Sequence, residues 1–380
     1  MTAGLDVTYR EGLHRSVPPS ETLTRLTPLL PEFGITRTAD ITGLDRLGIP
    51  TWIAVRPTAL ILQVSNGKGI SHVASKVGAI MEAIEHWHAE NPAGELRQAS
   101  VSELQREDRV TVPAAVLPDY LPDLHLTDRR TVSWIRGEDM ADGTPVWVPA
   151  SAVFQITPMF FQSSTNGLAA GNHLVEATLH ALYELIERDA MARLTRGGIS
   201  LPRRGSRVVR LDTVPAGLVA SLRDQLRRAG VTLVLVRVES IAPVCTFWAT
   251  LVDPASQLAC SFVNTGHGSH LSPTVAAVRA ITEAAQSRLT YIHGSREDLS
   301  ADSYQFGEVH ERLQAFFQRQ RGDLSWADIE DHSSTDLVRD LETVIGGLRS
   351  AGFRRVYRVD LTRARFSIPV VRMLVPGLHH

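Results

Sequence analysis

A short helical signature occurs twice in this chain and constrains its fold more than any other feature. The first copy reads Ala79-Ile-Met-Glu82-Ala-Ile-Glu85-His86, and the second, about a hundred residues later, reads Ala181-Leu-Tyr-Glu184-Leu-Ile-Glu187-Arg188. An Asn-Gly pair precedes each copy, at Asn66-Gly67 and at Asn166-Gly167, and such pairs predict turns. A turn followed by a similar helix, repeated at nearly one offset, predicts a pseudo-twofold internal repeat.

The spacing of the glutamates indicates a charged site between the two helices. Residues three apart share a helix face, so Glu82 and Glu85 point the same way, as do Glu184 and Glu187. Like charges on one face destabilise a helix by about 0.2–0.5 kcal/mol per pair. We therefore expect a positive partner, and a hard cation with oxygen ligands such as Mg²⁺ is the natural one. A single E-x-x-E is usually a solvated helix edge, but two matching copies favour a site.

Further polar residues extend this pattern. Glu176 and His180 continue the carboxylate face of the second helix toward its start. A third helix is predicted after Pro273, where Arg279, Glu283 and Gln286 fall on one face. The glycine-rich segment Gly67-Lys68-Gly69 places backbone N–H groups and one lysine just before the first helix, an arrangement that suits phosphate.

Composition excludes several classes of protein. The 380 residues are 43% hydrophobic with a formal net charge of -2, so no general basic excess indicates a nucleic-acid binder. No apolar run approaches the roughly 18 residues of a membrane span, and the N-terminus lacks the basic start and apolar core of a secretory signal. Cys245 and Cys260 lie in apolar runs and are predicted core residues. We expect a cytoplasmic protein without membrane segments.

Hydrophobic periodicity predicts a mixed α/β (α+β) chain without a low-complexity linker, folded as one interlocked unit. Residues 266–270 are predicted as a small-residue loop, and residues 300–335 as a helical excursion or lid. Strands are predicted at 34–41, 50–57, 132–135, 146–148, 154–156, 231–238, 244–252, 258–263, 356–361 and 369–375, and further helices at 174–194, 215–228 and 336–350.

Three blocks together resemble a known family. SNGKGISHVASKVGAIMEAIEHWHAE, STNGLAAGNHLVEATLHALYELIERDA and AVRAITEAAQSRLTYIHGSRED occur in the order found in the YcaO family of ATP-dependent enzymes, which activate backbone amides of peptides or proteins. The resemblance runs from about Arg15 to the C-terminus. It implies a YcaO-like fold in which mixed sheets are packed by helices that carry an ATP and magnesium site. Residues 1–60 would be an N-terminal segment contributing to the site, and residues 61–380 the ATP-binding domain.

The resemblance also assigns roles to individual residues. It implies that Mg²⁺ is held by Glu82, Glu85, Glu184 and Glu187 between the phosphates of ATP. It implies catalytic roles for Arg279 and Glu283. Residues implied to contact the nucleotide are Arg15, Ser16, Lys68, Ser164, Asn172, Glu176 and Arg188, with Ser164, Asn172 and Glu176 near the ribose and adenine.

In the chemistry that the resemblance implies, ATP phosphorylates the amide oxygen and so turns it into a good leaving group. A side chain then gives an azoline, sulfide gives a thioamide and an amine gives an amidine. The C-terminal end, Pro369 to His380, lacks the P-x-P-x-P tail common in azoline-forming members. This ending, together with the blocks Gly34-Ile-Thr-Arg and Ser295-Arg296, resembles the thioamide-forming branch that pairs with TfuA proteins. The implied partners are a peptide or protein substrate, a TfuA-like protein, a sulfur donor and a second copy of the chain in a homodimer.

Other readings stay open at this point. An azoline-forming cyclodehydratase and an amidine-forming enzyme use the same activation step with another nucleophile. A non-catalytic peptide-binding scaffold could keep the fold, although retention of all four glutamates with Arg279 and Glu283 speaks against it. A di-iron protein is disfavoured because its helices carry Glu-x-x-His pairs.

Overall fold

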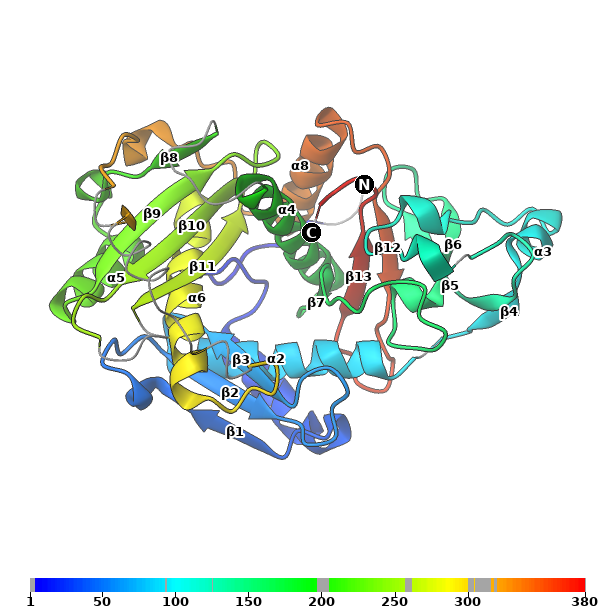
Figure 1. Ribbon diagram of the computed structural model, residues 1–380, viewed down its shortest axis with the longest axis horizontal. Helices are drawn as coiled ribbons and strands as arrows, with labels where there is room; N and C mark the ends of the chain where they lie inside the picture. Colours follow the sequence, from blue (N-terminus) through cyan, green and yellow to red (C-terminus); the bar gives the residue numbers. More distant parts are fainter. Residues whose placement is uncertain are drawn as a thin grey trace.

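Three antiparallel sheets and seven α-helices make up the part of the chain that the computed structural model describes (Figure 1). This part comprises residues 4–92, 94–124, 126–196, 205–256, 262–299, 304, 316–317 and 320–379. The mixed α/β class is therefore confirmed. The helices are α1 (Pro19–Leu26), α2 (His72–Glu90), α3 (Val101–Arg106), α4 (Leu174–Thr195), α5 (Leu218–Arg228), α6 (Pro273–His293) and α8 (Leu337–Ser350).

The first sheet has the order β1-β2-β3 and supports helix α2. Its strands are β1 (Arg37–Asp40), β2 (Thr51–Val55) and β3 (Val64–Lys68). The predicted turn at Asn66-Gly67 is wrong, because both residues lie inside β3 and pair with Ile53 and Trp52 of β2. The predicted N-terminal segment thus shares this sheet with the rest of the chain.

The second sheet has the order β11-β10-β9-β8, with α5 and α6 packed against it. Its strands are β8 (Ser206–Val208), β9 (Thr232–Val238), β10 (Cys245–Val252) and β11 (Val263–His270). The predicted loop at 266–270 is wrong, since these residues pair with β10 along their whole length. Cys245 is buried in β10 as expected, whereas Cys260 and most of the predicted strand at 258–263 lie outside the described residues.

The third sheet has the order β4-β5-β12-β13-β7, with β6 paired to β5, and α4 packs against β13 and β7. The predicted strand at 154–156 is wrong, because these residues form bends and no strand. Much of the predicted excursion at 300–335 lies outside the described residues. The strands are β4 (Arg97–Ala99), β5 (Val132–Asp139), β6 (Pro145–Pro149), β7 (Leu168–Ala170), β12 (Tyr357–Asp360) and β13 (Val370–Leu374).

The same strand–helix unit occurs three times, once on each sheet. The units are β3 with α2, β7 with α4, and β11 with α6. In each unit a helix glutamate accepts a hydrogen bond from a backbone N–H group. This N–H group lies in the strand of the same unit or directly before it. The bonds join Asn66 N to Glu82 (2.7 Å), Gly167 N to Glu184 (3.3 Å) and His267 N to Glu283 (3.2 Å). The structure thus shows a third unit of the same kind beside the two that the predicted repeat contains.

Local sequence explains where the three long helices begin and end. The Ser71 side chain accepts a hydrogen bond from Ala74 N at the start of α2, and the His173 ring accepts one from Val175 N at the start of α4. Pro273 occupies the first turn of α6, where its missing N–H costs nothing, and Gly294 ends that helix in the left-handed conformation.

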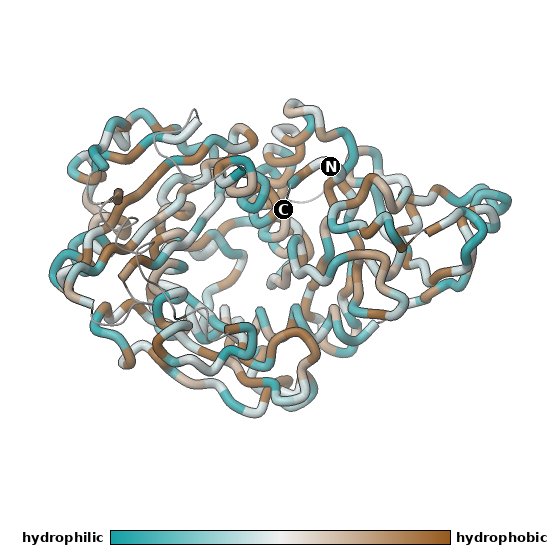
Figure 2. The backbone as a smooth tube through the Cα atoms, in the orientation of Figure 1, coloured by the Kyte–Doolittle hydropathy of each residue, from teal (hydrophilic) through white to brown (hydrophobic). Residues whose placement is uncertain are grey.

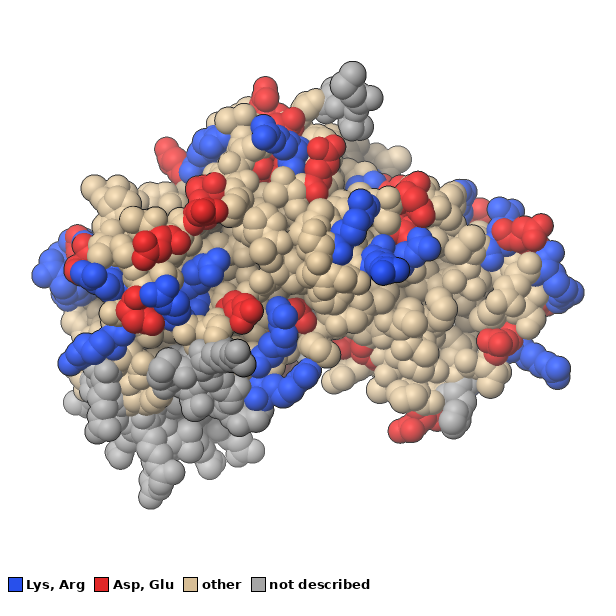
Figure 3. Space-filling view, turned by 90° about the horizontal axis from the view of Figure 1, so that it is seen from above, with Lys and Arg blue, Asp and Glu red and all other residues tan. Residues whose placement is uncertain are grey.

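Apolar side chains fill the space between the sheets and these helices. Figure 2 shows hydrophobic stretches along interior strands such as β9 and β10, and hydrophilic stretches over outer loops. Basic and acidic side chains are interspersed on the face seen in Figure 3. Within the described residues, no helix combines the length and apolar composition needed to cross a bilayer.

The glycine of the first unit permits close approach of its strand and helix. A Cβ atom on Gly67 would lie 2.0 Å from the Ser75 carbonyl oxygen and 2.2 Å from the Ala79 nitrogen. Both atoms belong to the α2 backbone, so they cannot move aside without displacing the helix. Gly67 therefore serves helix packing, which is a different role from the phosphate loop expected from the Gly-Lys-Gly segment.

We predict that Gly67→Ala lowers thermal stability, because the added methyl group would push α2 off β3. Overpacking of this kind typically costs about 1–3 kcal/mol. Gly43→Ala is the control, since a Cβ at Gly43 meets nothing within 4 Å and should change stability by less than about 0.5 kcal/mol. Circular dichroism would follow the thermal unfolding of wild type and both variants. Equal melting temperatures for Gly67→Ala and Gly43→Ala would contradict this packing argument.

Candidate functional site

A cavity of about 620 Å³ lies where the three strand–helix units meet. Its walls come from α2, α4 and α6, from the strands before them, and from the N-terminal segment around Arg15. Eleven of the thirteen residues predicted for the site line this cavity: Arg15, Lys68, Glu82, Glu85, Asn172, Glu176, Glu184, Glu187, Arg188, Arg279 and Glu283. Ser16 and Ser164 are not among its lining residues.

Backbone N–H groups fix the glutamates predicted to hold magnesium. Glu82 and Glu184 each accept the strand N–H of their own unit. Glu85 accepts the N–H of Ala170 in the neighbouring unit, at 2.7 Å. Glu187 differs from these three, since its Oε2 atom is buried and has no hydrogen-bond partner. Three of the four carboxylates are thus oriented by the main chain, and the fourth has a free oxygen.

Burial disfavours the ionised forms of these four carboxyl groups. It raises the pKa of Glu82 to about 7, although Arg296 and Lys68 act in the opposite direction. Burial also raises the pKa of Glu85 well above its ordinary value and raises the pKa of Glu184. Burial and the neighbouring Glu283 both raise the pKa of Glu187. A bound cation would favour the ionised form of all four.

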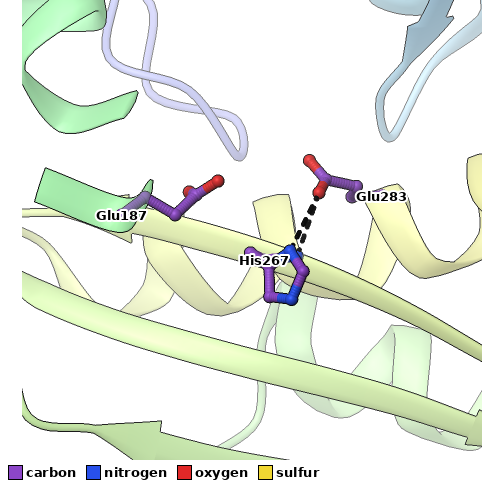
Figure 4. A group of neighbouring side chains, drawn as sticks. All are labelled: Glu187, His267 and Glu283. Atoms are coloured by element: carbon purple, nitrogen blue, oxygen red, sulfur yellow. Dashed lines mark hydrogen bonds and ion pairs between the residues drawn. The ribbon is translucent and has the colours of Figure 1, made fainter. Parts of the chain in front are cut away.

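Glu283 differs from these four carboxyl groups because its pKa is lowered. Burial alone would raise the pKa of Glu283, but Lys68 and His267 hold it well below its usual range. Lys68 Nζ lies 2.7 Å from Glu283 Oε2, and His267 Nδ1 lies 3.5 Å from Glu283 Oε1. Figure 4 shows Glu283, His267 and Glu187 converging from α6, β11 and α4.

The N-terminal segment is fastened to the cavity wall by Glu176, which is only 2% exposed. The N–H and Oγ of Ser16 both donate to Glu176 Oε2 at 3.0 Å, and Arg15 Nε lies 3.7 Å from Oε1. The backbone N–H and side-chain Nδ2 of Asn172 donate to the same Oε1. Because these donors occupy both oxygens of Glu176, its role here is to hold Arg15 at the cavity.

Arginines from two helices face the carboxylates. Arg188 lies 3.8 Å from Glu184 across one turn of α4, and Glu184 and Glu187 raise the pKa of Arg188 despite its burial. Arg279 lies 3.5 Å from the His180 ring nitrogen, and burial followed by Arg279 lowers the pKa of His180 well below its ordinary value. His180 is therefore a neutral wall residue beside Arg279.

Ser164 lies outside the main cavity. It lines a small separate pocket with Asp119 and Arg372, and its Oγ accepts a hydrogen bond from Asn166 N at 3.2 Å. Ser164 therefore stabilises the turn before β7 in this structure. Its assignment to the ribose or adenine stays a prediction.

Sequence reasoning missed two contributors to the cavity. Arg296 lies in the turn after α6, forms an ion pair with Asp298 and faces Glu82. His267 lies on β11 beside Glu283 and was not among the predicted site residues, because a single histidine is more often structural than a ligand or base. The signal that could have found it is the pattern Asn264-Thr-Gly266-His267, which resembles the Asn-Gly pairs before the other two helices.

Comparison with known proteins identifies the family. A family model described as YcaO cyclodehydratase, ATP- and Mg²⁺-binding, matches residues 66–379. The chain belongs to the YcaO family. The predicted family and the cofactors ATP and Mg²⁺ are thus confirmed, and the chain is a member of a family of ATP-dependent enzymes. The di-iron reading is excluded by this membership.

Relatives of this YcaO chain cover nearly its whole length. An uncharacterized protein of Mycobacterium tuberculosis is 36% identical over 98% of this chain and 84% of its own length. A Rhizobium leguminosarum bv. trifolii protein, named for its position in the tfuA 3′ region, is 34% identical over 96% of this chain and 88% of its own. The solved structure of YcaO from Methanopyrus kandleri bound with AMPPCP and Mg²⁺ superposes with a TM-score of 0.80, at 25% identity over 98% of this chain and 94% of that chain.

We predict a pH-dependent effect of Glu82→Gln on metal-free stability. Because the folded-state pKa of Glu82 is raised from 4.5 to about 7, the native state binds a proton that the unfolded state has released. Wild-type stability is therefore lost as pH rises through this window. The melting temperature of Glu82→Gln minus that of wild type should increase between about pH 5 and pH 8.

Glu342→Gln, at an exposed position on α8, is the matched control and should show no such trend. A difference between Glu82→Gln and wild type that stayed constant with pH would contradict the burial of an ionisable carboxyl at Glu82.

Proposed function

We propose that this YcaO enzyme uses ATP and Mg²⁺ to activate a backbone amide of a peptide or protein, and that sulfide then converts this amide to a thioamide. The γ-phosphoryl group of ATP passes to the amide oxygen, and hydrosulfide attacks the amide carbon. The C–O bond breaks with release of phosphate, and the proton of hydrosulfide leaves on the phosphate. The products are a thioamide, ADP and inorganic phosphate, so atoms and charges balance.

The observation that carries this proposal is the convergence of the predicted residues on one cavity of suitable charge. Among the described residues, eight carboxylates and five Lys or Arg side chains line it, which leaves an acidic excess. A buried carboxylate oxygen without a partner, Glu187 Oε2, is also present. Divalent cations would offset this excess and ligate the unpaired oxygen, so the residues fit Mg²⁺ together with a nucleotide.

We assign roles to the lining residues from their position. Glu82, Glu85, Glu184 and Glu187 would hold Mg²⁺, which supplies charge neutralisation along the phosphate chain. Arg15, fixed by Glu176, and Arg279, placed against His180, present cationic groups to the same space. Glu283 orients Lys68, whose ammonium group can contact phosphate oxygens without moving its backbone.

Sulfide as the nucleophile is supported by the relative from Rhizobium leguminosarum, because that protein is named for its position in the tfuA 3′ region, which fits the TfuA-associated branch. A TfuA-like partner and a sulfur donor would then complete the reaction, with the enzyme acting as a homodimer in the cytoplasm.

We predict that Glu187→Ala, and equally Glu82→Ala, reduces peptide-dependent ADP release by about 10²–10³-fold or more, because each variant removes a group that holds the cation. The fold should persist, which circular dichroism would check. Glu342→Ala, at an exposed position on α8, is the control and should keep full turnover. Undiminished ADP release by Glu187→Ala would contradict the magnesium assignment.

Product analysis separates the possible nucleophiles. Mass spectrometry of the modified peptide should show one oxygen replaced by sulfur when sulfide is supplied. Loss of water would instead indicate an azoline, and incorporation of an amine would indicate an amidine. Absence of nucleotide binding in the wild type, measured by calorimetry with Mg²⁺ and any TfuA-like partner present, would favour the peptide-binding scaffold.

A further inference from the structure

The third strand–helix unit carries an amide where the other two carry a carboxylate. In each unit, one helix glutamate accepts a backbone N–H from its own strand region. Three residues later the first unit has Glu85 and the second has Glu187, whereas the third has Gln286, which also lines the cavity. An amide oxygen accepts hydrogen bonds without carrying a charge. The third unit thus offers a neutral acceptor at the position where the other two offer an ion.

Two amide oxygens of the cavity wall are buried and unpaired. Within the described part of the chain, neither Gln286 Oε1 nor Asn66 Oδ1 has a hydrogen-bond partner. Both residues line the cavity, and Asn66 is only 4% exposed. A buried acceptor oxygen without a donor costs free energy, so two of them in one wall indicate a ligand that supplies donors.

Hydrogen bonds to Thr290 fix the orientation of the Asn66 amide. Thr290 Oγ1 donates to the Gln286 carbonyl oxygen, one turn earlier in α6, at 2.9 Å. Because the hydroxyl proton is used in this bond, Thr290 Oγ1 accepts from Asn66 Nδ2, at 2.7 Å. This contact assigns the amide nitrogen to Thr290 and leaves Oδ1 as the unpaired atom. Asn66 and Gln286 are thus joined through Thr290 in one wall.

Helix α6 runs along the cavity and sets the order of its lining residues. Arg279 lies at the end that holds Arg15, because both line a smaller pocket together with Glu176. At 1.5 Å per residue, Gln286 lies about 10 Å further along the helix axis than Arg279. Glu283 lies between them. The unpaired amide oxygens therefore lie toward the end of the cavity away from Arg15, where Glu176 already has donors on both of its oxygens.

The proposed reaction requires a peptide beside the phosphates. Phosphoryl transfer needs the accepting oxygen roughly in line with the leaving oxygen, and therefore close to the glutamates that would hold the cation. Asn66 meets this requirement, because its backbone N–H donates to Glu82 at 2.7 Å. A peptide that presents a carbonyl oxygen to the phosphate also carries backbone N–H groups. Asn66 Oδ1 and Gln286 Oε1 are matching acceptors for these groups.

We propose that Asn66 Oδ1 and Gln286 Oε1 accept backbone N–H groups of the peptide substrate and so form the subsite that orients its amide for phosphorylation. This inference rests on the proposed function and adds the residues that recognise the peptide backbone. Recognition through main-chain N–H groups does not depend on the side chains of the substrate. Gln286 in the third unit therefore serves the peptide, whereas Glu85 and Glu187 at the matching positions serve the cation.

Binding of two small probes to the full-length protein with Mg²⁺ and AMPPCP tests this subsite. One probe is N-acetyl-triglycine N′-methylamide. The other is the same molecule with every amide nitrogen methylated, which keeps the carbonyl oxygens and loses the N–H donors. Calorimetry should show that wild type prefers the first probe by about fivefold for each hydrogen bond. Gln286→Leu and Asn66→Ala should each reduce this preference by about fivefold.

Two further variants serve as controls. Gln286→Glu keeps an acceptor oxygen at the same position and should retain the preference. Gln105→Leu makes the matched change at an exposed position on α3 and should behave as wild type. An undiminished preference in Gln286→Leu would overturn the inference and leave the nucleotide site intact. Failure of N-acetyl-triglycine N′-methylamide to bind the AMPPCP complex would do the same.

Nucleotide affinity separates this inference from the proposed function. Gln286→Leu should bind AMPPCP with Mg²⁺ as tightly as wild type, because the Gln286 amide contacts the peptide and not the nucleotide. A weaker affinity in this variant would assign Gln286 to the nucleotide or its metal ion and overturn the inference alone. Absence of AMPPCP binding to the wild type would overturn the proposed function together with the inference.

Discussion

Mutual repulsion of carboxylates inside an enclosed space is the constraint on which the rest of this structure depends. Two ionised carboxylates such as Glu187 and Glu283, with oxygens within 4.8 Å, would repel each other by about 3.5 kcal/mol or more at an effective dielectric constant of 20. The fold offsets this repulsion in two ways. Backbone N–H groups donate hydrogen bonds to the glutamates, and Lys and Arg side chains lie near them. A site built in this way is already arranged before a nucleotide arrives, so little binding energy is lost in ordering it.

The threefold use of one strand–helix unit explains how such a site is assembled from a single chain. Each unit contributes one helix glutamate pinned to its own strand, and the three sheets orient these helices toward a common space. Divergence of the units then gives the cavity unlike walls, because the first two units carry pairs of glutamates, whereas the third carries Glu283 with His267 and Arg279. The chemical asymmetry of the cavity therefore comes from different residues at corresponding positions of the three strand–helix units.

The sequence predicted the long helices and the four paired glutamates because E-x-x-E is a dense local signal on a 3.6-residue period. Arg15, Asn172 and Arg188 were expected at the site only through the resemblance to the YcaO family. The sequence-based prediction failed where the local pattern of residues was weaker. Glu283 is followed by Gln286 and not by a second glutamate, so the third unit was not matched to the others. Strands β3 and β11 contain Gly and Asn, residues typical of turns, because their helices approach the backbone closely. Arg296 could not be placed from sequence, since a turn after a helix gives no periodicity.

The N-terminal segment is held at two places, by residues at the start of α8 and by Glu176 in the cavity wall. Leu5 N donates to Asp336 Oδ1 at 2.9 Å and Val7 N donates to the Thr335 carbonyl at 2.9 Å, while Arg15 and Ser16 reach Glu176. During synthesis on the ribosome, Leu5 and Val7 have these partners only after residue 336 has emerged, although Glu176, the partner of Arg15 and Ser16, emerges much earlier. A nascent chain interrupted between residues 176 and 336 can thus place Arg15 at the cavity while the segment before it still lacks its anchor.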